Sequence, residues 1–206
     1  MIAIIDYGVG NIFSLYSSFG YIGAEAVLTD DREAIRRADR VVLPGVGAFG
    51  DAAEKLRRSG LDREVLSCAE SGKPLLGICL GMQLLFEKSF EYGEHLGLGL
   101  IKGKVVSMEP EVPKGYKVPH IGWNSLYFPE NKQKSPLFRY IDEGDFVYFV
   151  HTFYGTECSE SVIAGTEYGI PLTASVSSGN VYGVQFHPEK SGQVGMNILK
   201  AFCEIE

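Results

Sequence analysis

Short apolar runs alternate with amphipathic stretches through the first eighty or so residues of this chain. The runs are rich in Ile, Val and Leu, as expected for strands that are buried on both faces. The stretches between them have helical spacing. The pattern predicts strands at 2–5, 26–28, 40–43 and just before Cys79, with helices over 11–19, 32–38, 50–58 and 62–71. Strands that alternate with helices favour a parallel sheet joined by crossover helices.

The pattern changes after about residue 97, where strand-like segments follow one another across short turns. These segments are 99–107, 120–128, 146–150, 162–166, 173–177 and 182–186, and a final helix is predicted over about 195–203. Such a series favours antiparallel pairing. We therefore expect one α/β domain over residues 1–206, with an open, mostly parallel twisted sheet, flanking helices and an antiparallel strand extension in the C-terminal half.

Composition and charge exclude several classes of protein. Of the 206 residues, 45% are hydrophobic and 22% are charged, which suits one domain with a full core. The net charge of −7 argues against a general binder of nucleic acid or anionic membranes. No apolar run approaches about 18 residues, and the N-terminus lacks a basic region and a cleavage site. We expect a cytoplasmic protein without a membrane span or signal peptide.

Cysteine spacing and glycine spacing give no sign of a metal or cofactor. The cysteines are far apart and form no C-x-x-C pair, so neither zinc nor a disulfide framework is indicated: Cys68, Cys79, Cys158 and Cys203. Gly8-Val9-Gly10 follows the first strand, but the third glycine and the downstream acid of a dinucleotide fingerprint are not in place. We expect no metal site and no cofactor.

An apolar strand pattern ends at Cys79, and a helix-forming run follows at once. Gly77 and Gly81 flank the cysteine where a strand would turn sharply into a helix. This is the nucleophile-elbow pattern with a thiol in place of a hydroxyl. Backbone N–H groups at the start of the helix stabilise a thiolate, the form of cysteine that attacks carbonyl carbon. A small buried cysteine that closes a core strand is the competing interpretation.

A second strand pattern leads to His187-Pro188-Glu189. Proline disfavours helical backbone in the preceding residue, so we expect His187 to be extended, with Glu189 on the same side. The carboxylate would hold one imidazole nitrogen protonated and leave the other free as a base. Alone, these residues fit a surface turn equally well. Together with Cys79 they predict a Cys-His-Glu triad, in a chain order unlike that of α/β-hydrolases.

Five motifs in order along the chain carry a family resemblance: Asp6-Tyr-Gly-Val-Gly-Asn11, Leu43-Pro-Gly-Val-Gly-Ala-Phe49, Gly77-Ile-Cys-Leu-Gly-Met-Gln83, Val118-Pro-His-Ile-Gly-Trp-Asn124 and Gly183-Val-Gln-Phe-His-Pro-Glu-Lys-Ser191. The chain resembles the class I (triad) glutamine amidotransferases and, among them, the glutaminase subunits of imidazole glycerol phosphate synthase. The resemblance implies a flavodoxin-like core and hydrolysis of glutamine to glutamate and ammonia.

The resemblance also implies roles for individual residues. Cys79 would be the nucleophile that forms a glutamyl thioester, His187 the general acid and base, and Glu189 its orienting carboxylate. The oxyanion donors would be backbone N–H groups of Leu80 and of the Val46 and Gly47 segment. Glutamine contacts would come from Gly47, Gln83, Glu91, His151 and Thr152. Gln83 lies four residues after Cys79, so both would lie on the same face of a helix, which supports a glutamine contact from Gln83. This chain has Thr152-Phe153 where we expect Ser-Tyr in many relatives. A backbone contact to glutamine would survive this change, but a hydroxyl contact from position 153 would not.

Free ammonia in neutral water is mostly captured as ammonium, which has no lone pair for attack, so it must pass along a sheltered path to its acceptor. Because the chain is too short to hold an acceptor site as well, we expect a partner subunit. The resemblance identifies the partner as a cyclase subunit with a (β/α)8 barrel, in a heterodimer of histidine biosynthesis that makes imidazole glycerol phosphate and aminoimidazole carboxamide ribonucleotide. It places four residues toward that partner: Asn11, Trp123, Tyr148 and Lys190. From sequence alone, a lone Trp is more often part of the core, and Lys190 is an ordinary surface lysine.

Several interpretations stay open. The same triad would suit a γ-glutamyl hydrolase, a cysteine peptidase, or the glutaminase subunit of another synthase; a non-catalytic homologue would be expected to lack a triad member. The glycines of Pro44–Gly47 would let the second oxyanion donor stay misaligned until the partner binds its substrate, or would simply form a tight loop. For His95 and His120 we expect structural roles.

Overall fold

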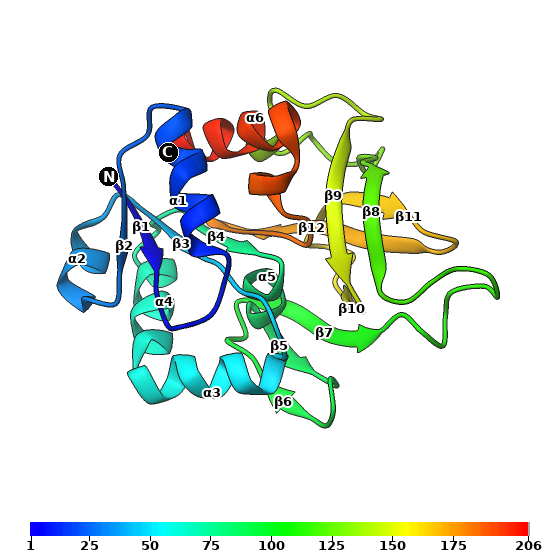
Figure 1. The fold of residues 1–206 in the computed structure, drawn as a ribbon, viewed down its shortest axis with the longest axis horizontal. Coiled ribbons are helices and arrows are strands. Elements are labelled where there is room, and N and C mark those ends of the chain that lie inside the picture. Colours follow the sequence, from blue (N-terminus) through cyan, green and yellow to red (C-terminus); the bar gives the residue numbers. More distant parts are fainter. Residues whose placement is uncertain (206) are drawn as a thin grey trace.

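A seven-stranded sheet forms the centre of the computed structural model, which describes residues 1–205 (Figure 1). Two antiparallel strands, β12 (Pro171–Ser178) and β11 (Val162–Glu167), lie at one side of it. The other five are parallel neighbours, in the order β13 (Val181–Val184), β4 (Leu75–Ile78), β3 (Arg40–Leu43), β1 (Ile2–Ile5) and β2 (Ala26–Thr29). That parallel order is the flavodoxin-like one. The predicted fold class and its antiparallel extension are confirmed.

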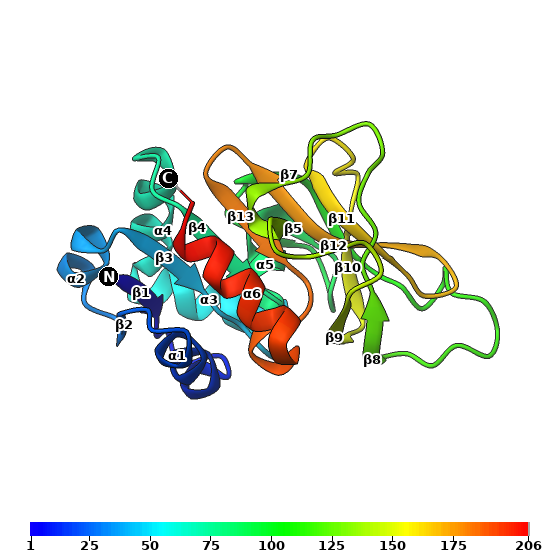
Figure 2. The same cartoon turned by 90° about the horizontal axis from the view of Figure 1, so that it is seen from above.

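Helices cover both faces of the sheet, as the two views in Figures 1 and 2 show. One face carries α1 (Ile12–Tyr21) and α6 (Gly192–Cys203), and the other carries α2 (Arg32–Arg37), α3 (Phe49–Ser59), α4 (Leu61–Glu70) and α5 (Leu80–Leu84). Along β1, Ile2 and Ile4 pack toward α1 and α6, whereas Ala3 and Ile5 pack toward the other helices. Burial on both faces explains the unbroken apolar runs in the sequence.

Two smaller sheets hold the remaining strands. The first contains β10 (Phe153–Thr156), β7 (Ile101–Ser107), β5 (Phe86–Ser89) and β6 (His95–Leu96). In the second, β8 (His120–Ser125) pairs with β9 (Phe146–His151). The predicted strands at 99–107, 120–128 and 146–150 therefore exist, but they lie outside the central sheet. A 3₁₀ turn, η1 (Pro136–Phe138), lies between β8 and β9 in the sequence.

The predicted helices begin and end within a few residues of the observed ones. Asn11 holds the N-cap position of α1, but its side chain makes no capping hydrogen bond. The helix after Cys79 is short, because Phe86 already belongs to β5. None of the helices in the described part of the chain is long and apolar enough to cross a membrane.

Candidate active site

Cys79 occupies a tight turn between β4 and α5. Its backbone has φ 54° and ψ −111°, a conformation that non-glycine residues rarely adopt and that costs of order 1–3 kcal/mol. A Cβ at Gly81 would overlap the carbonyl oxygen of Leu43, and a Cβ at Gly77 would lie 2.7 Å from the carbonyl oxygen of Gly81. Glycine is therefore required on both sides of the cysteine for steric reasons, as the elbow pattern predicted.

The sheet topology brings His187 to the same edge of the sheet as Cys79. β4 and β13 are parallel neighbours, and the Cys79 N–H donates to the carbonyl of Val184, the last residue of β13, at 2.8 Å. His187 follows three residues later, and its own N–H donates to the Tyr148 carbonyl at 2.9 Å. Because parallel strands end at a common edge, the thiol and the imidazole reach the same pocket.

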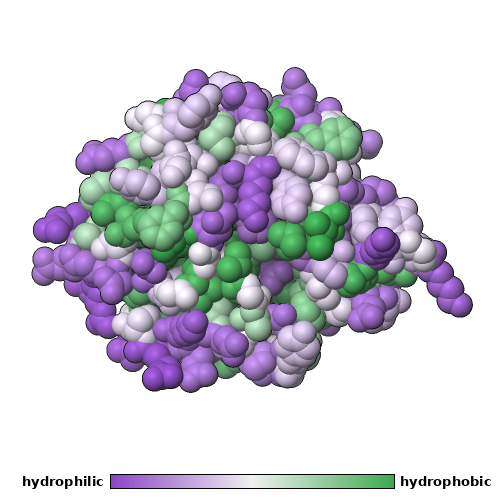
Figure 3. Space-filling view, viewed as in Figure 1, coloured by the Kyte–Doolittle hydropathy of each residue, from purple (hydrophilic) through white to green (hydrophobic). Residues whose placement is uncertain are grey.

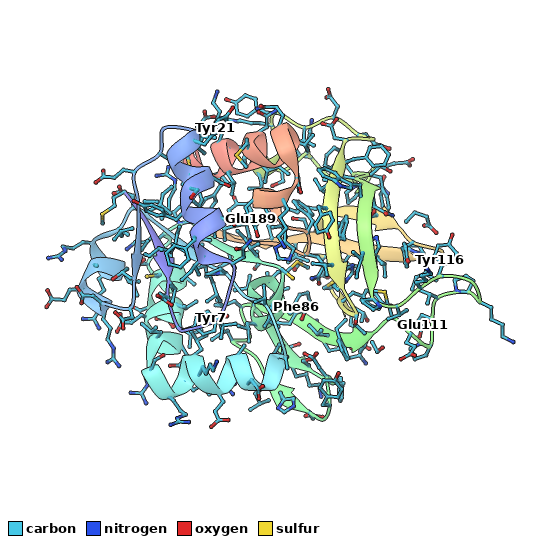
Figure 4. The ribbon with its side chains drawn as sticks, in the orientation of Figure 1. Tyr7, Tyr21, Phe86, Glu111, Tyr116 and Glu189 are labelled. Carbon is cyan, nitrogen blue, oxygen red and sulfur yellow. The ribbon has the colours of Figure 1, made fainter. Side chains whose placement is uncertain are left out.

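His187 is paired with Glu189, but not by the route that the sequence predicted. Its Nδ1 lies 2.8 Å from the Glu189 Oε1, and both side chains are buried. β13 ends at Val184, and Glu189 lies in a 3₁₀ turn, η2 (Pro188–Lys190), so the expected extended geometry holds for His187 alone. Pro188 starts this turn because its φ is fixed near the helical value. Figure 4 places Glu189 in the middle of the molecule, between α1 and β9.

The electrostatics favour a protonated His187. Burial lowers the pKa of His187, but its interactions with Cys79 and Glu189 outweigh burial and raise that pKa to about 10. The buried Nε2 has no hydrogen-bond partner of ordinary geometry among the described residues. Cys79 is nevertheless close enough for its charge to raise the pKa of the ring. The arrangement suits a thiolate beside an imidazolium, with Glu189 holding the far side of the ring.

A cavity of about 320 Å³ opens beside these side chains. Cys79 and His187 line it together with every residue for which the resemblance implied an oxyanion or glutamine contact: Leu80, Val46, Gly47, Gln83, Glu91, His151 and Thr152. Pro119, Val150 and Phe153 complete the lining. The cavity therefore gathers residues that lie more than a hundred positions apart in the sequence.

The segment Pro44–Gly47 is held by two hydrogen bonds. The Leu80 N–H donates to the Gly45 carbonyl at 3.3 Å, so this expected oxyanion donor is already engaged. The Tyr7 hydroxyl donates to the Pro44 carbonyl at 2.8 Å. Burial, and secondarily the charge of a Cys79 thiolate, raise the pKa of Tyr7, so the phenol stays neutral and remains a donor. Tyr7 was not among the predicted site residues.

Two polar side chains of the cavity are each oriented by a backbone group. Glu91 accepts the Phe49 N–H at 2.6 Å with its Oε2, and burial raises the pKa of this carboxyl. Gln83 donates from its Nε2 to the Phe153 carbonyl at 3.0 Å. Phe153 therefore contributes its backbone carbonyl here, while its ring packs against Tyr92.

His151 and His120 form a buried pair behind the cavity. The Nδ1 of His151 contacts the Phe153 carbonyl at 2.9 Å, and its Nε2 lies 3.1 Å from the Nδ1 of His120. Burial lowers the pKa of His151 to about 3, so this ring is unsuited to acid–base work near neutral pH. His120 stacks on Tyr168 and bonds Asn124, and the ring of His95 packs against Gly50. These contacts support structural roles for His120 and His95.

Comparison with known proteins identifies the family. The family model for glutamine amidotransferase class-I matches residues 3–205. The chain belongs to the class-I glutamine amidotransferase family. The resemblance inferred from the five motifs is thereby confirmed for the family as a whole.

Within this family, the chain is similar along its whole length to proteins named imidazole glycerol phosphate synthase subunit HisH. The relative from Wolinella succinogenes is 47% identical and that from Caldanaerobacter subterraneus subsp. tengcongensis 49% identical; the alignments cover 100% of this chain and 100% and 98% of those proteins. Among solved structures, PurLQS from Thermotoga maritima superposes with a TM-score of 0.75 at 21% identity, covering 98% of this chain and 97% of that one. The likeness to this structure shows a shared fold.

The family's expected partner-facing residues lie on one face of the molecule. Trp123 is 51% exposed and packs edge-on against Tyr148, with ring centroids 6.0 Å apart. The Lys190 Nζ lies 5.9 Å from the centre of the Tyr148 ring, and α1, which Asn11 precedes, packs beside η2. Figure 3 shows hydrophobic residues over the start of α1 and across the middle of this face. Trp123 is therefore a surface residue and not part of the core.

Sequence reasoning missed Tyr7 and Gln185. Gln185 is fully buried, and its side chain contacts both Gln83 and Cys79. The only sequence signal was its position two residues before His187. In the predicted strand it is one of the alternating residues, and the pattern assigns no function to it. In the part of the chain that the structure describes, no group of three or more His, Cys, Asp or Glu side chains is arranged to hold a metal.

Proposed function

We propose that this chain is the glutaminase subunit of imidazole glycerol phosphate synthase, and that its ammonia passes to a (β/α)8 cyclase subunit. The observation that carries the proposal is that Cys79, at a strained strand-to-helix turn, shares a cavity with His187, which is hydrogen-bonded to Glu189 and whose pKa is raised by Cys79 and Glu189. Full-length identity of 47–49% to HisH proteins supports the choice of synthase.

The reaction is a two-step acyl transfer. The Cys79 thiolate attacks the side-chain amide carbon of glutamine, and the imidazolium of His187 gives its proton to the departing nitrogen, releasing ammonia and leaving a glutamyl thioester. Neutral His187 then takes a proton from water, and the resulting hydroxide attacks the thioester. Collapse of that adduct releases glutamate and restores the thiolate and imidazolium. Glu189 keeps Nδ1 protonated throughout, so that the Nε2 performs each transfer.

Glutamine is held at the end of the cavity formed by Gln83 and Glu91. Both N–H groups of the Gln83 amide are engaged by protein, so its oxygen is the atom left for the substrate. One Glu91 oxygen accepts the Phe49 N–H, and the other is left for a cation such as the α-ammonium group of glutamine. The backbone of His151 and Thr152 borders the same space.

Oxyanion stabilisation requires a rearrangement of Pro44–Gly47. The Leu80 N–H must leave the Gly45 carbonyl to donate to the oxyanion, and an N–H of Val46 or Gly47 supplies the second donor. Loss of one such donor costs about 3–4 kcal/mol of transition-state stabilisation in other enzymes. Gly47 has φ 96°, where a non-glycine residue would be strained. We infer that the cyclase, docked over Asn11, Trp123, Tyr148 and Lys190, promotes this change when its own substrate is bound.

The proposal is tested with the chain and its co-expressed cyclase partner. Glutamate release from glutamine is measured against release from γ-glutamyl peptides, and Cys79→Ala is compared with the unaltered chain. We expect hydrolysis of glutamine alone, its loss in Cys79→Ala, and an intact complex in both. Preferential cleavage of γ-glutamyl peptides would indicate a γ-glutamyl hydrolase or peptidase. Co-purification with a different synthase would overturn the choice of partner.

A further inference from the structure

Gln185 joins two parts of the site through the two ends of its side chain. Its Oε1 lies 3.0 Å from the Nε2 of Gln83, and its Nε2 lies 3.8 Å from the sulfur of Cys79. The residue is fully buried, and its backbone N–H donates to the Ala174 carbonyl at 2.9 Å. Both the position of its main chain and the position of its amide are therefore fixed.

The direction of this amide follows from its neighbours. The Phe153 carbonyl can only accept, so the Gln83 group that meets it at 3.0 Å is the NH₂. The second hydrogen of that NH₂ points to Gln185, which must present its oxygen. The NH₂ of Gln185 is then the end that faces Cys79. Reversing either amide would set two donors or two acceptors against each other in a buried place, at the cost of a hydrogen bond.

We propose that Gln185 is a further catalytic residue, whose side-chain N–H donates to the Cys79 sulfur in its thiolate form and whose oxygen fixes the Gln83 amide toward the substrate. The inference rests on the proposed function in taking Cys79 as the nucleophile. A neutral amide serves both steps, because it still donates after His187 has given its proton to ammonia. It stabilises the sulfur again when the thioester breaks down and the thiolate leaves.

Two substitutions separate the contact with sulfur from the contact with Gln83. Gln185→Glu keeps an oxygen for the Gln83 N–H and places an acceptor opposite the sulfur. Gln185→Met has a similar length and removes both contacts. Gln133→Glu makes the same change of charge at an exposed position and serves as the matched control. Alkylation of Cys79 by iodoacetamide, followed by peptide mass spectrometry, reports on the thiolate directly and distinguishes Cys79 from the other three cysteines.

In both Gln185 variants we expect iodoacetamide to alkylate Cys79 about ten- to a hundredfold more slowly at pH 7, which is the range for losing a hydrogen bond to a charged group. The pH profile of alkylation should move to higher pH. In the complex, Gln185→Glu should lower kcat for glutamine with little change in KM, whereas Gln185→Met should also raise KM. Gln133→Glu should match the unaltered chain in each assay. Alkylation rates within twofold of the unaltered chain in correctly folded variants would overturn the proposal.

A measurement on the unaltered chain covers the case in which both variants fail to fold. The Gln185 side-chain NH₂, labelled with ¹⁵N, should shift in the NMR spectrum as the Cys79 thiol is deprotonated and should lose that response in Cys79→Ser. A signal that is insensitive to Cys79 ionisation would contradict the contact. These experiments report on the sulfur without glutamine. A Cys79 thiol that responds to Gln185 but does not hydrolyse glutamine would therefore refute the proposed function while leaving the contact between Gln185 and the Cys79 sulfur established.

Discussion

Glu91 accepts a hydrogen bond from the backbone N–H of Phe49 at 2.6 Å, at the first residue of α3. A residue on the wall of the cavity beside Cys79 thereby caps a helix that is distant from it in the sequence. The N-cap residue of α3, Ala48, has no side chain that could do so. Under the proposed function, substrate binding and local stability therefore depend on the same carboxylate.

Replacing Glu91 should separate these two roles. In Glu91→Gln the amide oxygen can still accept the Phe49 N–H, but the negative charge is gone, so we expect KM for glutamine to rise about tenfold or more with a small change in stability. Glu91→Ala should show the same rise in KM and lose a further 0.5–2 kcal/mol or so of unfolding free energy. Steady-state kinetics and thermal unfolding check both. An unchanged KM in Glu91→Gln would contradict the proposed substrate contact.

The pH dependence of glutamine binding follows from the same residue. Burial raises the pKa of Glu91, so the carboxylate is lost on acidification at a higher pH than for an exposed glutamate. We expect KM to rise as the pH falls through that value, while KM in Glu91→Gln stays flat over the same range. The measurement is KM for glutamine from pH 8 down to about pH 5, with unfolding followed in parallel.

Glu189→Gln should shift the alkaline limb of activity. The Glu189 carboxylate helps to raise the pKa of His187, so its removal lowers that pKa, and the imidazolium is lost at a lower pH. Activity should also fall, by up to about 10⁴-fold if the ring is left in the wrong tautomer. The profile of kcat/KM against pH, in the complex, tests the direction. An alkaline limb at an unchanged or higher pH would show that Glu189 does not support the charged ring.

Tyr7→Phe should loosen the Pro44–Gly47 segment. Loss of the bond to the Pro44 carbonyl leaves a buried acceptor unpaired, which costs about 1–3 kcal/mol of unfolding free energy. If this bond helps to keep the Leu80 N–H on Gly45, glutamine hydrolysis by the subunit without its partner should increase, and stimulation by the partner should decrease. Parallel assays with and without the cyclase decide this; an unchanged basal rate would mean that Tyr7 only supports the fold.

Trp123→Ala should weaken association with the cyclase about tenfold or more, because Trp123 is an exposed aromatic side chain packed beside Tyr148. Alkylation of Cys79 in the isolated chain should not change. Tyr21→Ala is a suitable control, since Tyr21 is 78% exposed at the far end of α1 from Glu189 (Figure 4). Titration calorimetry with the cyclase measures the affinity of both variants. An equal loss of affinity in Tyr21→Ala would show that the effect of Trp123→Ala is not specific to the proposed interface.

The central sheet could be predicted from sequence because burial on both faces leaves an unbroken apolar signal. β1 and β3 match the predicted ranges, and the glycines around Cys79 mark a turn that only glycine allows. β5, β6 and β10 were not predicted, since each has at most four residues, and β10 pairs with β7, which is distant in the sequence. Local sequence carries little information about such pairings.

The site was predictable where chemistry is local and unpredictable where it depends on the fold. His187 and Glu189 are two residues apart, so their pairing was expected, although a 3₁₀ turn and not a strand produces it. Tyr7 and Gln185 gain their contacts only when Pro44 and Cys79 arrive from other strands. The sequence around Tyr7 gives no sign of a polar partner in the core, and the nearness of Gln185 to His187 does not identify Gln83 or Cys79 as its partners.

The bond between the Leu80 N–H and the Gly45 carbonyl has a metabolic consequence under the proposed function. A donor that is already occupied cannot stabilise a developing negative charge, so glutamine bound at rest would keep its nitrogen. Exchange of one acceptor for another, in a loop of four residues, would then decide whether the cell's nitrogen reserve is consumed or conserved.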